Sequence, residues 1–87
     1  MKIVVVCGMG LGSSHYLLTE IIKILKEIEL EAEVENCDLF SASDRGADVY
    51  IGADYIMHLL DTPHLKIGLA DVLDHEALKK HLEQLKE

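Results

Sequence analysis

Strand-like and helix-like stretches alternate along the whole chain of 87 residues. Apolar or alternating segments typical of β-strands occupy residues 2–7, 31–37, 48–52 and 65–69. Amphipathic stretches typical of helices occupy about residues 14–29, 53–60 and 74–86. This alternation predicts one α/β domain over residues 1–87, with a parallel sheet and helices on both of its faces.

Two of the predicted helices have a clear apolar face. In the first helix that face comprises Leu17, Leu18, Ile21, Ile22, Leu25 and Ile28. Charged residues on its other side, Glu20 among them, are predicted to face water. The last helix has Ala77, Leu78, Leu82 and Leu85 on one face and Asp74 as its predicted N-cap.

The polarity of the strands predicts their order in the sheet. Segments 2–7 and 48–52 are mostly apolar, as expected of interior strands, whereas 31–37 alternates with glutamates and 65–69 is interrupted by Lys66 and Gly68. This favours an open four-stranded sheet of order 2-1-3-4 and a Rossmann-like architecture. In such a sheet ligands bind at the carboxyl ends of the strands, beside the point where the winding reverses. Cys7 lies at that point.

Composition excludes several classes of function. Eight basic and sixteen acidic residues give a net charge of −8, and Arg45 is the one arginine, which argues against nucleic-acid binding. No apolar run reaches the ~20 residues of a membrane helix, and the N-terminal run is interpreted as a strand, not a signal peptide, so a cytoplasmic protein is expected. Cys7 and Cys37 form no C-x-x-C pair, and we expect no metal or cofactor. Cys37 is predicted to be a buried strand-end residue, with a disulfide to Cys7 as the alternative.

The segment that follows the first strand is the strongest chemical signal in the chain. Three alternating glycines let backbone N–H groups point at an anion, and the first turn of the next helix adds unpaired donors. A thiol at this place loses its proton easily, so Cys7 is predicted to be a nucleophile whose ligand is phosphate. The predicted phosphate-binding residues are Gly8, Met9, Gly10, Leu11, Gly12, Ser13 and Ser14.

Known phosphate-binding motifs match this segment only in part. Ser13 stands where the dinucleotide fingerprint has its third glycine, and also where a cysteine phosphatase of the C-x5-R type has arginine. Without that arginine the segment favours a carrier of phosphate over a hydrolase. A small phosphatase related to the low-molecular-weight type and a non-catalytic phosphate-binding module stay as alternatives. His15 is an auxiliary candidate that either assists the phosphoryl group or points to solvent.

The chain also resembles a known family. The segment V-C-G-M-G-L-G-S-S-H, the N-C-D at 36–38 and G-A-D-V-Y-I-G-A-D-Y-I at 46–56 are similar to the IIB components of the sugar phosphotransferase system, most of all to the ascorbate- and galactitol-type branch. The resemblance implies a four-stranded parallel sheet and phosphorylation of Cys7. It further implies a phosphohistidine donor protein, IIA, and a membrane permease, IIC, that holds the sugar. Met9 and Leu11 are then predicted either to contact these partners or to pack on the core.

Overall fold

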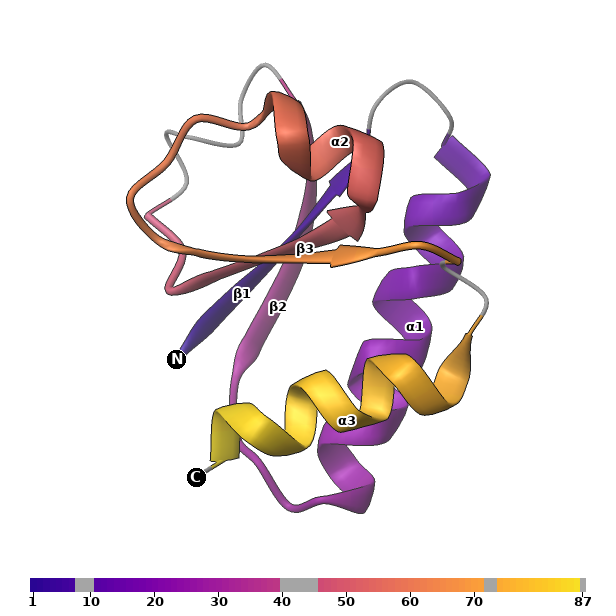
Figure 1. Ribbon diagram of the computed structural model, residues 1–87. Coiled ribbons are helices and arrows are strands. Elements are labelled where there is room, and N and C mark those ends of the chain that lie inside the picture. Colours follow the sequence, from indigo (N-terminus) through magenta and orange to yellow (C-terminus); the bar gives the residue numbers. More distant parts are fainter. Residues whose placement is uncertain (8–10, 40–45, 72–73, 87) are drawn as a thin grey trace.

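The computed structural model describes residues 1–7, 11–39, 46–71 and 74–86, with residues 7 and 11–15 described by their backbone alone (Figure 1). In chain order the elements are β1 Lys2–Cys7, α1 Leu11–Glu27, β2 Glu33–Asp38, β3 Val49–Ala53, α2 Asp54–Leu59, β4 Leu65–Leu69 and α3 His75–Lys86. The alternation of strands and helices is confirmed.

The four strands form one parallel sheet of order β2-β1-β3-β4, as their polarity predicts. β2 and β4 are the edge strands, and β1 pairs with β2 on one side and with β3 on the other. In this register Val6 pairs with Cys37, and Cys7 pairs with Asp38. β1 and β4 have the predicted bounds, while β2 and β3 are displaced by one or two residues toward the C-terminus.

Helices cover both faces of the sheet, as predicted (Figure 1). α1 and α3 lie on one face, where Ile3 and Val5 of β1 are fully buried with the apolar residues of both helices. α2 lies on the other face, where Val4 and Val6 pack with it in a second cluster. Because successive residues of a strand point to opposite faces, β1 contributes to both cores.

The apolar face of α1 differs from the prediction at two positions. Ile22 is 39% exposed, whereas Ile24 is fully buried. The buried positions Leu17, Ile21 and Leu25 define a stripe along the helix. At 100° per residue, position 24 lies about 20° from Leu17 at one edge of the stripe, whereas position 22 lies about 60° beyond Leu25 at the other. The apolar face predicted for α3 is confirmed by burial of Leu78 and Leu82.

Both ends of α1 also differ from the prediction. The helix begins at Leu11, three residues before the expected start, and ends at Glu27 instead of Glu29. Glu29 has a positive φ of 58°, and the Leu30 N–H donates to the Leu25 carbonyl at 3.0 Å. This is a Schellman-type ending, in which the left-handed position is usually glycine. Here a glutamate holds it, so the sequence lacks the usual stop signal.

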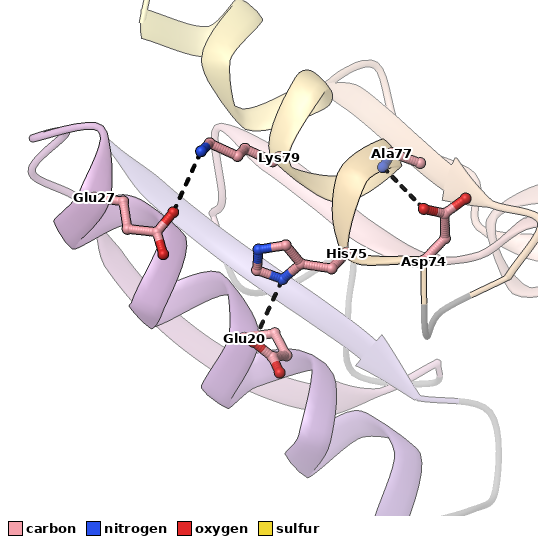
Figure 2. A network of polar contacts seen from close by, with 6 residues as sticks. All are labelled: Glu20, Glu27, Asp74, His75, Ala77 and Lys79. Carbon is pink, nitrogen blue, oxygen red and sulfur yellow. Dashed lines mark hydrogen bonds and ion pairs between the residues drawn. The ribbon is translucent and has the colours of Figure 1, made fainter.

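The N-cap predicted for α3 is confirmed. The Ala77 N–H donates to the Asp74 carboxylate at 3.1 Å, which satisfies one of the unpaired donors of the first turn (Figure 2). α3 thus begins at a defined point, beside the carboxyl end of β4.

We expect Glu29→Gly to stabilise the protein by about 0.5–1 kcal/mol, because glycine adopts the left-handed conformation without steric cost. Thermal unfolding of parent and variant checks this, and a rise of several degrees is expected for a domain of this size. The control is Lys23→Gly in the exposed interior of α1, which should destabilise by about 1 kcal/mol. A fall in melting temperature for Glu29→Gly would contradict the assignment.

Candidate functional site

The residues predicted to bind phosphate lie where β1 ends and α1 begins. Cys7 is the last residue of β1, and Leu11 is the first residue of α1. Gly8, Met9 and Gly10 lie outside the described residues, so the role predicted for them stays a prediction. Leu11, Gly12 and Ser13 belong to the first turn of α1, whereas the sequence predicts them in the loop before a helix that begins at about residue 14.

This early start changes the expected source of hydrogen bonds. The first four N–H groups of an α-helix have no partner within the helix. Among the described residues of α1 these include the N–H groups of residues 11–13, part of the segment predicted to bind phosphate. They begin only four positions after Cys7, and the helix dipole adds a partial positive charge there. The arrangement is therefore suited to stabilising an anion beside the cysteine.

The sheet sets the surroundings of Cys7. On one side its backbone pairs with Asp38, the last residue of β2. On the other side, β1 pairs with β3, and Val5 pairs with Ile51. When this register is extended by two residues, Ala53 lies at the level of Cys7. α2 begins directly after Ala53, at Asp54. The carboxyl end of β1 thus lies between the end of β2 and the junction of β3 with α2.

Two glycines make this junction compact. A Cβ at Gly52 would lie 2.8 Å from the Val6 carbonyl oxygen and 3.0 Å from the Met57 methyl carbon. A Cβ at Gly68 would lie 3.2 Å from the Asp54 Cα and would overlap the Asp54 carboxylate. Gly52 therefore lets β3 lie close to the peptide that precedes Cys7, and Gly68 lets α2 begin over β4.

A polar network joins the early turns of α1 to α3 (Figure 2). The Glu20 carboxylate lies 3.6 Å from Nδ1 of His75, the first residue of α3, and its side chain is only 16% exposed. The Tyr16 hydroxyl donates to the same carboxylate, and this hydrogen bond, together with the carboxylate charge, raises the pKa of Tyr16. The helical pattern predicts that Glu20 faces water, so this contact could not be found from the sequence.

Of the other candidate residues, Cys37 is the one whose side chain the structure describes. Cys37 is 9% exposed within the apolar cluster on the α2 side of the sheet, which confirms the predicted burial. The side chains of Cys7 and His15 lie outside the described part of the structure, so the alternative disulfide and the auxiliary role of His15 stay predictions. Among the described residues no group of histidine, cysteine, aspartate or glutamate side chains is arranged to hold a metal ion.

Comparison with protein families decides between the alternatives. A model described as PTS system, Lactose/Cellobiose specific IIB subunit, matches residues 2–84. The chain belongs to this family. The resemblance to IIB components is thereby confirmed, and this IIB protein carries phosphoryl groups in a sugar phosphotransferase system, with IIA and IIC partners. No individual curated protein matches it. In the part of the chain that the structure describes, no helix of this IIB protein is long and apolar enough to cross a membrane.

Gly52→Ala is expected to destabilise the protein by about 1–3 kcal/mol, because the new methyl group displaces the Val6 carbonyl or the Met57 side chain. The shift reaches the residue before Cys7, so the rate of phosphoryl transfer should fall as well. Thermal unfolding and transfer kinetics measure the two effects. Gly46→Asn is the control, because Gly46 has φ 66° with nothing within 4 Å and asparagine tolerates that conformation. Equal stability of the two variants would contradict the close approach.

Glu20→Gln is expected to lower the raised pKa of Tyr16 toward its ordinary value of 10.0, since the charge that favours the protonated hydroxyl is removed. In the parent, the stabilisation from this hydrogen bond is complete below the ordinary pKa and is lost as the pH rises through the raised pKa. Ultraviolet titration of tyrosinate, with Tyr16→Phe to assign the signal, measures the shift. An unchanged titration in Glu20→Gln would rule out the Tyr16–Glu20 interaction.

Proposed function

We propose that Cys7 is the residue that carries the phosphoryl group. The observation that supports this best is the position of Cys7 at the carboxyl end of β1, four residues before the N-terminus of α1. A thiolate is stabilised at such a place by unpaired amides and by the helix dipole, which lower the thiol pKa. The same amides are suited to the oxygens of a phosphoryl group.

The proposed reaction is a relay in two steps. In the first, the Cys7 thiolate attacks the phosphorus of a phosphohistidine on the IIA protein. A P–S bond forms, the P–N bond breaks, and the electron pair of that bond stays on the histidine nitrogen. In the second step, a hydroxyl of the sugar held by the IIC permease attacks the phosphorus and loses its proton to water. The P–S bond breaks and the thiolate is restored.

Ser13 supports a relay over a phosphatase. In a hydrolase of the C-x5-R type, an arginine at this position would bind the phosphoryl oxygens bidentately and stabilise the charge of the transition state. With serine there, backbone amides from the first turn of α1 are the main donors, and they hold the group without strong hydrolytic assistance. We therefore assign phosphate binding to residues 8–14, with His15 as an auxiliary residue, and expect the protein to act in the cytoplasm.

The sugar is the most specific part of the proposal. The cysteine-glycine motif favours an ascorbate- or galactitol-like sugar, whereas the matched family is described by lactose and cellobiose. Membrane vesicles that contain the cognate IIC permease, together with phosphorylated protein, distinguish these sugars. Phosphorylation of ascorbate or galactitol is expected. Phosphorylation of cellobiose or lactose alone would contradict this assignment of the sugar.

Labelling tests the carrier role directly. With a radiolabelled phosphohistidine IIA donor, we expect one label per chain. Iodine should release this label, as it releases the phosphoryl group of a thiophosphate. Cys7→Ser should abolish the label, while the matched variant Cys37→Ser should keep it. Labelling of Cys7→Ser at the parent level would overturn the assignment, and steady hydrolysis of an aryl phosphate would favour the phosphatase.

A further inference from the structure

The outer face of α2 is the most exposed apolar surface among the described residues. Tyr55 is 71% exposed and Leu59 is 67% exposed, more than any other large apolar side chain in that part of the chain. They are four residues apart and therefore lie on the same side of the helix. The opposite side of α2 is buried through Ile56 and Met57. The helix is thus covered toward the sheet and bare toward solvent.

This surface lies beside Cys7. α2 follows β3 without an intervening residue, and the register sets Ala53 at the level of Cys7. Neighbouring strands are about 4.8 Å apart and successive Cα atoms about 3.8 Å, so the Cα atoms of Tyr55 and Cys7 are at most about 12 Å apart. Figure 1 shows α2 beside the tips of β1 and β3, at the same end of the sheet as the first turn of α1. A protein that delivers a phosphoryl group to Cys7 therefore comes close to Tyr55.

The charge around this surface is negative. β2 ends in Asp38, β3 is followed by Asp54, and β4 is followed closely by Asp71, and all three are exposed. Of the described lysines, Lys66 of β4 contacts the C-terminal end of α2, and the others belong to the start of β1, to α1 and to α3: Lys2, Lys23, Lys26, Lys79, Lys80 and Lys86.

Contacts place Lys66 at one end of the α2 surface and Lys79 away from it. The Lys66 Nζ donates to the Leu60 carbonyl at 2.9 Å, at the end of α2 farthest from Cys7, and Lys79 pairs with Glu27 in the last turn of α1. Neither ammonium group lies among the aspartates at the carboxyl ends of the strands. The surface thus combines an apolar centre with an acidic border at the end nearest Cys7, while Lys66 lies at its other end.

We propose that this face of α2, centred on Tyr55 and Leu59, is the docking surface for the phosphohistidine donor protein IIA. The proposal rests on the carrier role of Cys7. The occupant is an apolar patch on the donor bordered by lysine or arginine side chains, because apolar centres with complementary charged borders are typical of specific interfaces. The IIC permease fits less well, because the membrane surface around it is itself negatively charged.

The test measures transfer of phosphoryl groups to Cys7 from the same phosphohistidine IIA donor that labels the parent protein. Tyr55→Ser, Leu59→Ser and the double variant are compared with the parent in rapid-quench experiments. We expect the double variant to reduce kcat/KM at least tenfold through a higher KM, and the parent rate to fall as salt is added. Ile22→Ser is the matched control: Ile22 is also an exposed apolar residue, but it lies in the middle of α1. It should change kcat/KM less than twofold.

The outcomes separate this proposal from the carrier role. Absence of label from the parent protein, or label retained in Cys7→Ser, overturns the carrier role and the docking proposal with it. Normal labelling of the parent with an unchanged kcat/KM in the double variant overturns the docking proposal alone. Normal loading by IIA combined with slower transfer from the double variant to sugar in permease vesicles assigns the surface to IIC and likewise overturns it. Circular dichroism verifies that each variant is folded.

Discussion

The pairing of β1 between β2 and β3 is the constraint on which the rest of the structure depends. Parallel pairing brings the carboxyl ends of all four strands to one edge of the sheet, and the central place of β1 puts Cys7 in the interior of that edge. α1 and α2 both begin at this edge, on opposite faces of the sheet. One pattern of hydrogen bonds thus positions the thiol, the helix amides and the exposed surface of α2 relative to one another.

Close packing at two glycines makes this arrangement rigid. Gly52 lies against the Val6 carbonyl, and Gly68 lies against Asp54, the first residue of α2. At each glycine, the space that a side chain would fill is occupied by a group at the carboxyl edge of the sheet, the Val6 carbonyl in one case and Asp54 in the other. The second G-A-D in the sequence therefore has a packing role, in addition to carrying the resemblance to IIB proteins.

Much of the fold could be predicted from the sequence, because the polarity of a strand reports its place in a sheet. The continuous apolar character of 2–7 and the glutamates of 31–37 were enough for the strand order and for the position of Cys7. The ends of α1 could not be predicted in the same way. Gly12 and Ser13 are typical of loops, yet they belong to the first turn of the helix. At the other end, Glu29 adopts a conformation that usually requires glycine.

Side-chain environments were harder to predict than elements. Glu20 looks like a solvent-facing residue in any helical projection, and only the position of α3 reveals that it lies between Tyr16 and His75. Tyr50 is fully buried, and its hydroxyl has no hydrogen-bond partner among the described residues, which no local pattern indicates. Such environments depend on contacts between elements far apart in the sequence.

The aspartates that follow the strands also bear on the energetics of a carrier. A phosphoryl group would change the charge at Cys7 from that of a thiolate to nearly −2, about one more negative charge at an edge that already has Asp38, Asp54 and Asp71. Repulsion between like charges raises the free energy of the loaded protein relative to the empty one. On the proposed function, the acidic edge therefore increases the phosphoryl-transfer potential of the carrier, and the group tends to leave for a neutral sugar hydroxyl.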